Sequence, residues 1–196
     1  MPWVNGTSVE KMKPISQGVI EIWKKTGKVT VMRSSGRCMV PLFDDGTPLV
    51  VRHVEPQKIR VGDIAVFRVG SMTMAHRIIG KFEKEGRLYF REKRDSGFLP
   101  GVITQDAVIG KVIGINREGD GIDLESGLWR SANRFIGHYW SFLFALYDRF
   151  IGLKKRMMKE RKIPLAVGIY SWISSLSIGA ANLFISLLRR LSHKKS

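Results

Sequence analysis

The only cysteine of the chain, Cys38, is the residue best suited to nucleophilic chemistry. It follows Gly36 in the segment 34–41 (SSGRCMVP), which reads as a turn. A nucleophile on such a turn presents its side chain freely, and the nearby backbone N–H groups can stabilise an oxyanion. One cysteine can form neither an internal disulfide nor a zinc cluster of several thiolates. The alternative interpretation is a small, buried hydrophobic residue without reactivity.

A thiol nucleophile needs a base, and the sequence offers two histidines for this role. His76 stands in the segment 75–79 (AHRII), and a carboxylate such as Asp95 could orient its ring. His53 is nearer to Cys38 along the chain, but no motif surrounds it, so we interpret it as a surface residue. Asp106 is an alternative to Asp95. These residue types make Cys38, His76 and Asp95 candidates for a catalytic triad, while a buried Cys38 and a structural His76 stay open as alternatives; no metal and no cofactor is expected.

These residues lie in a stretch, 29–116, whose pattern is typical of short strands. Apolar or alternating runs are separated by turn signals such as Asp44-Asp45-Gly46 and Val61-Gly62-Asp63. This pattern predicts a mainly β fold with a compact antiparallel core. An amphipathic helix is expected within 1–28, and a linker at 117–128. The predicted strands cover 29–31, 49–51, 64–67, 88–90 and 108–115.

The remaining segment, 129–196, is both basic and apolar. The whole chain has a formal net charge of +16, and this segment contains 13 Lys and Arg residues against 2 Asp and Glu. Residues 163–188 carry no charge, and roughly 20 apolar residues suffice to cross a bilayer. The pattern predicts a membrane-spanning helix at 163–188 and a second candidate at 135–153. An interfacial helix or a helix packed on the protein remains the alternative. Basic charge beside apolar segments favours membrane lipid over nucleic acid as a partner.

Six short segments occur in an order that resembles the signal peptidase I superfamily, which includes the self-cleaving SOS repressors. They are 34–41, 44–46, 61–67, 75–79, 93–95 and 108–112. The resemblance implies the β core of that family, with Cys38 where the family has its serine. It also implies the histidine type of active site, with His76-Arg77 at the base position. Arg94-Asp95 stands where the family has Gly-Asp, and Lys93 is interpreted as carrying charge only.

The function implied by this resemblance is a membrane-associated endopeptidase. Its substrate would be an extended leader or precursor peptide that binds beside a strand edge and is cleaved by acyl transfer. The alternative is a catalytically inactive relative that binds a peptide or a partner protein at the membrane. A nucleic-acid-binding regulator of the SOS type is disfavoured, because only about 28 residues precede the β core. The side of the membrane on which the core lies is not determined by the sequence.

Overall fold

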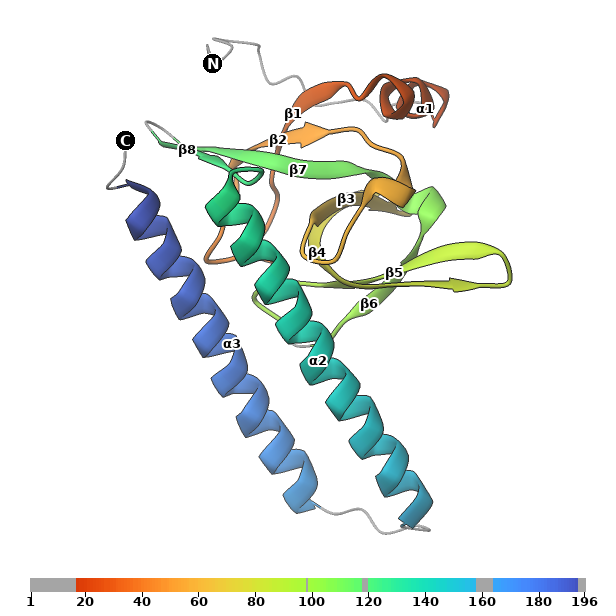
Figure 1. Ribbon diagram of the computed structural model, residues 1–196, viewed down its shortest axis with the longest axis vertical. Coiled ribbons are helices and arrows are strands. Elements are labelled where there is room, and N and C mark those ends of the chain that lie inside the picture. The colour runs from red at the N-terminus through yellow and green to blue at the C-terminus, as the bar shows by residue number, and fades with distance from the viewer. Residues whose placement is uncertain (1–16, 98, 118–119, 158–163, 194–196) are drawn as a thin grey trace.

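The computed structural model describes residues 17–97, 99–117, 120–157 and 164–193. Within these ranges the chain forms three α-helices, eight strands and two short 3-10 helices (Figure 1). The helices are α1 (Gln17–Thr26), α2 (Gly127–Met157) and α3 (Pro164–His193). The strands are β1 (Val29–Arg33), β2 (Pro48–Arg52), β3 (Ile64–Val69), β4 (Met72–Lys84), β5 (Arg87–Lys93), β6 (Gly101–Thr104), β7 (Val108–Arg117) and β8 (Asp120–Asp123). The 3-10 helices are η1 (Pro56–Lys58) and η2 (Gln105–Ala107).

The strands form one antiparallel sheet that curls into a half-barrel (Figure 1). Their order is β1-β2-β7-β3-β4-β5-β6, and β8 pairs with β7 outside this path. The long strand β7 therefore joins the N-terminal hairpin to the β3–β4 hairpin, although it is late in the sequence. All five strands predicted from the pattern are present. The predicted linker at 117–128 differs, because its residues 120–123 form β8 against β7.

The fold is mixed α/β: the predicted antiparallel core and a helical C-terminal segment are both present, and the helices form a larger part of the fold than a mainly β protein implies. The difference comes from α2, which begins at Gly127 and continues as one helix through the region expected to start a tail. Trp129, Ala132, Ile136 and Trp140 are buried at helical spacing and belong to the same core cluster as the sheet residues. The helix is thus part of the domain core.

No helix in the described ranges is both long enough and apolar enough to cross a bilayer. The predicted spans at 163–188 and 135–153 are therefore wrong; Ile163 itself lies outside the described residues. Some of the apolar residues of these segments pack within the protein, while others, such as Phe142 and Leu183, are exposed. In α3, Ala181, Ile185 and Leu188 are buried at helical spacing in the cluster that also contains α2. A ring contact between Phe135 and Phe184 joins the two helices, which lie side by side (Figure 1).

A close backbone contact joins α2 to the sheet. Gly62 has φ +97°, and a side chain there would meet the backbone of Asn133 at 2.5 Å. A Cβ at Gly137 would in turn lie 2.6 Å from the Gly62 backbone. Two glycines, one in the turn before β3 and one in α2, therefore allow the helix to approach the sheet closely. This contact holds α2 next to the residues of the predicted site.

Candidate active site

Cys38 lies in the turn region between β1 and β2, where its side chain is half-buried and packs against the main core. Hydrogen bonds within the same loop hold this turn. The N–H of Gly36 donates to Asp45 Oδ1 at 2.8 Å, and the N–H of Ser34 donates to the Thr47 carbonyl at 2.9 Å. Gly36 has φ +85°, a conformation that glycine adopts without steric cost. The loop therefore presents a partly accessible thiol on an ordered turn.

The turn after β5 contacts the Cys38 loop directly. Both the backbone N–H and the hydroxyl of Ser96 donate to the Cys38 carbonyl oxygen, at 3.1 and 2.9 Å. Arg189 of α3 donates to the carbonyl of Pro41 in the same loop. The segments 34–41 and 93–95, which are far apart in the sequence, thus meet at one place.

Asp95 is bound to Arg77, and this pair is completely enclosed. Its two oxygens accept hydrogen bonds from Arg77 Nε at 2.8 Å and Nη2 at 2.7 Å, with 0% and 2% of the two side chains exposed. The third nitrogen of Arg77 donates to Asn133 Oδ1 of α2 at 2.7 Å and to the Gly62 carbonyl. A planar guanidinium suits this arrangement because its fork satisfies a carboxylate with two bonds. Asp95 therefore orients Arg77 and, through it, α2.

The carboxylate that contacts His76 is Glu92, in place of the predicted Asp95. His76 Nδ1 lies 2.7 Å from Glu92 Oε2, and the imidazole packs edge-on against Phe67. Neighbouring residues of a strand point to opposite faces, so His76 and Arg77 cannot share Asp95. The signal for Glu92 was present in the sequence. Leu88, Phe90 and Glu92 alternate along β5, and alternate residues of a strand point to the same face of the sheet. Glu92 was therefore to be expected on the face of the two buried residues.

The structure does not join Cys38 to His76. Among the described residues, no hydrogen bond connects Cys38 Sγ to a histidine ring, and the bonds at Cys38 involve its carbonyl oxygen. The two side chains also belong to different surroundings. Cys38 packs against the cluster that includes α2, whereas His76 packs on Phe67, which belongs to the second cluster. A nucleophile–base contact would need a rearrangement of one of the two.

Lys93, interpreted from the sequence as carrying charge only, is a buried residue. Only 1% of the residue is exposed, and burial lowers the pKa of its ammonium group from 10.5 to about 8, although nearby Asp95 opposes this effect. Its Nζ donates to the Arg94 carbonyl at 2.8 Å and lies 3.5 Å from the centroid of the Trp140 ring. Lys93 pairs with Arg77 in the β4–β5 register, so two buried cations share this face beside one Asp95.

His53 is also buried, with 0% exposure, so its interpretation as a surface residue is wrong. Its ring lies 3.0 Å from Thr30 Oγ1 and 3.2 Å from the Ile109 carbonyl, and Trp23 of α1 packs edge-on against it. Burial lowers the pKa of this imidazole. His53 therefore anchors α1 to the sheet. Asp106, the alternative third member, is exposed in η2.

Across the described part of the chain, no group of three or more His, Cys, Asp or Glu side chains is arranged to hold a metal ion. Comparison of the chain with protein-family models and with curated proteins gives no match. The resemblance to signal peptidases thus depends on the six short segments of the sequence alone.

Proposed function

We propose that this protein is a signal-peptidase-like endopeptidase that cleaves leader or precursor peptides with Cys38 as its nucleophile. The observation that supports this proposal is the junction between Ser96 and Cys38. It brings the nucleophile loop to the turn that follows β5, which is how the segments of this superfamily would have to meet. Cys38 is half-buried, so part of the residue is accessible from solvent.

The position of β1 supports an extended peptide as the substrate. This strand is at one edge of the sheet order and leads into the Cys38 turn. Val29 and Val31 on β1 are exposed, as expected for an edge that accepts a further strand. Added there, a peptide would use its main-chain hydrogen bonds for affinity and run toward the thiol.

The proposed reaction is acyl transfer. His76 accepts the proton of the Cys38 thiol, and the thiolate attacks the scissile carbonyl carbon. The oxyanion that forms is stabilised by backbone N–H groups of the turn. The C–N bond then breaks, the amine leaves with a proton from His76, and water hydrolyses the thioester to a free acid and the thiol. Glu92 would hold the His76 ring in one orientation. Because catalytic contacts often form only with substrate bound, we expect His76 and Cys38 to meet in the complex.

A second candidate, a catalytically inactive relative that binds peptides, is favoured by one specific observation. Cys38 packs against the main core, His76 contacts Phe67 of the second cluster, and both oxygens of Asp95 are bound by Arg77. In this case the β1 edge would bind a peptide and Cys38 would act only as a packing residue.

The test is incubation of the purified full chain with fluorescent precursor peptides that carry small residues beside the cut. The peptidase proposal expects Cys38→Ala and His76→Ala each to lower kcat/KM at least about a hundredfold. His138→Ala, an exposed histidine of α2, is the matched control and should leave the rate unchanged. Equal cleavage by wild type and Cys38→Ala would refute the proposal. Peptide binding without cleavage in all variants would establish the second candidate.

We also propose that the α2–α3 pair attaches the protein to the surface of an anionic membrane. Large apolar side chains are exposed on both helices, and the Phe135–Phe184 contact makes this surface continuous. The exposed set includes Phe135, Phe142, Leu146, Leu183, Phe184 and Leu187. The strong basic excess of 129–196 complements anionic lipid.

Vesicle flotation tests this attachment. Surface binding predicts flotation with phosphatidylglycerol vesicles and release by high salt or alkaline carbonate. The variant Phe142→Ser/Leu146→Ser should bind more weakly, because it removes exposed apolar area. A full chain that never floats would refute the attachment.

A further inference from the structure

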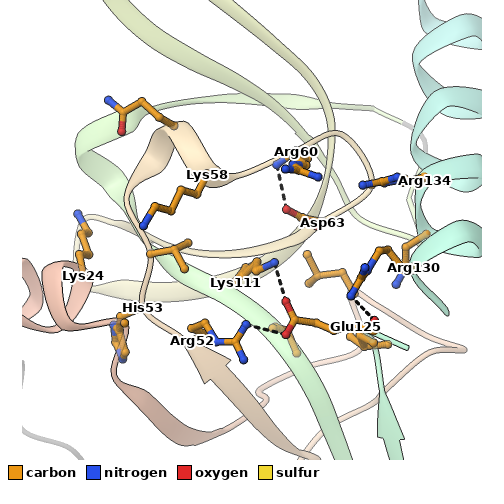
Figure 2. Close-up of a pocket in the computed structure, with 18 of the residues that line it drawn as sticks. Lys24, Arg52, His53, Lys58, Arg60, Asp63, Lys111, Glu125, Arg130 and Arg134 are labelled. Atoms are coloured by element: carbon orange, nitrogen blue, oxygen red, sulfur yellow. Dashed lines mark hydrogen bonds and ion pairs between the residues drawn. The ribbon is translucent and has the colours of Figure 1, made fainter. Parts of the chain in front are cut away.

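The structure contains a strongly cationic cavity that the proposed peptidase chemistry does not use. Its volume is about 700 Å³, and it lies among α1, the η1 loop, the starts of β3 and α2, and β7 (Figure 2). Eight Lys or Arg side chains line it, against two carboxylates, Asp63 and Glu125. The cations that the argument uses are Arg52, Lys58, Arg60, Lys111, Arg130 and Arg134.

The two carboxylates neutralise only part of this charge. Glu125 is shared by two cations, at 2.6 Å from Arg52 and 2.9 Å from Lys111. Asp63 accepts the backbone N–H of Arg60 at 2.9 Å, and burial raises the pKa of its carboxyl group. Within the part of the chain that the structure describes, no salt bridge involves Lys58, Arg60 or Arg134 (Figure 2).

These unpaired cations come from different elements and share one space. Figure 2 shows Arg134 extending from α2 toward the loop that carries Arg60. The approach of α2 is fixed by backbone contact between Asn133 and Gly62, so the helix cannot simply move away to reduce repulsion. Like charges held together in a concave site favour a bound anion, and guanidinium groups suit the oxygens of a phosphate.

The shape and lining argue against nucleic acid as the anion. Phe, Tyr and Trp are all missing from the described residues that line the cavity, so unpaired bases would find no aromatic surface for stacking. An open pocket of this volume has room for a small molecule with more than one phosphate group. A duplex, in contrast, presents its phosphates along a long convex surface.

We infer that this cavity is a binding site for phosphate groups, carried either by a small phosphorylated molecule or by a phospholipid headgroup. Lys58 and Arg60 on the η1 loop and Arg134 on α2 contact the phosphate oxygens. Lys111 and Arg52 remain held by Glu125 and form the base of the site. This inference is independent of the Cys38 chemistry, because neither Cys38 nor His76 lines the cavity.

The test is isothermal titration of the full chain with inorganic pyrophosphate. We expect saturable binding that Lys58→Ala/Arg60→Ala weakens at least about tenfold. The matched control is Lys84→Ala/Arg87→Ala, which removes the same charge from the exposed end of the β4–β5 hairpin and should change the affinity less than about twofold. Equal weakening by the two double variants would overturn the inference, since binding would then depend on net charge alone. Absence of saturable binding to the wild type would overturn it as well.

Two further arms identify the source of the phosphate. Vesicles of phosphatidylglycerol are compared with vesicles of phosphatidylcholine for the wild type and both double variants. If Lys58→Ala/Arg60→Ala loses binding to phosphatidylglycerol vesicles and the control double variant does not, the site is supported and its ligand is a lipid headgroup. Unchanged vesicle binding, with weakened pyrophosphate binding, supports it with a soluble ligand. A DNA duplex that displaces pyrophosphate and loses affinity with the same variant would overturn it in favour of a nucleic-acid surface.

Discussion

Replacing Lys93 by methionine should remove a buried charge that destabilises the folded protein near neutral pH. Burial lowers the pKa of Lys93 from 10.5 to about 8, which corresponds to about 3 kcal/mol. Between about pH 8 and pH 10.5, the unfolded chain holds a proton at Lys93 that the folded chain has released. The free energy of unfolding of the wild type therefore rises with pH in this window, and the cost of burial is fully present below pH 8.

In Lys93→Met this contribution is absent, while the aliphatic chain still packs on Trp140. The variant loses the contact between the ammonium group and the Trp140 ring, worth about 1 kcal/mol, and the hydrogen bond to the Arg94 carbonyl, of similar size. We therefore expect it to be about 1 kcal/mol more stable than the wild type near neutral pH. As the pH approaches 10.5, the wild type should become the more stable of the two.

The assay is urea unfolding followed by tryptophan fluorescence, at several pH values from about 7 to about 10. The quantity of interest is the difference between wild type and variant, because titrations common to both chains cancel. Lys84→Met is the control, since 69% of the Lys84 side chain is exposed and its difference should stay flat. A Lys93→Met difference that changes by less than about 0.5 kcal/mol over this range would refute the reasoning.

Three further predictions follow from the buried contacts. Gly62→Ala should lower the free energy of unfolding by about 2 kcal/mol more than Gly70→Ala. Both glycines have positive φ, but only a Cβ at position 62 meets the backbone of α2. Equal losses of the two variants in urea unfolding would contradict this prediction. Arg77→Met should cost about 3–5 kcal/mol by leaving Asp95 buried without its partner, whereas a loss below about 1 kcal/mol in the same assay would show that the pair is dispensable. Burial lowers the pKa of the His53 imidazole, so below pH 6.5 the unfolded histidine binds a proton that the folded one does not. The wild type should therefore lose stability as the pH falls below 6.5. In His53→Gln, thermal unfolding should show less of this loss.

Local pattern was sufficient to predict five of the eight strands and several turns between them, but it missed β4, β6 and β8. Such patterns depend only on near neighbours in the chain: the alternation of apolar residues, and the turn signals at Asp44-Asp45-Gly46 and Gly62-Asp63. The strands that these patterns predicted are present at the expected places. The same kind of reasoning was misleading for 135–153 and 163–188. An uncharged helical segment looks alike whether it faces lipid or a protein core, and here Trp140 and Ile185 are buried in the protein core.

The partners of the charged residues were decided by the tertiary structure alone. The sequence by itself determined that Cys38, His76 and a carboxylate are available. It could not determine that Asp95 binds Arg77 while Glu92 binds His76, because this depends on which strands pair and in which register. Burial of Lys93 and the gathering of cations around Asp63 likewise depend on where α2 crosses the sheet. Strand pairing and helix packing join residues distant in the chain, and a one-residue change of register would exchange the partners on both faces.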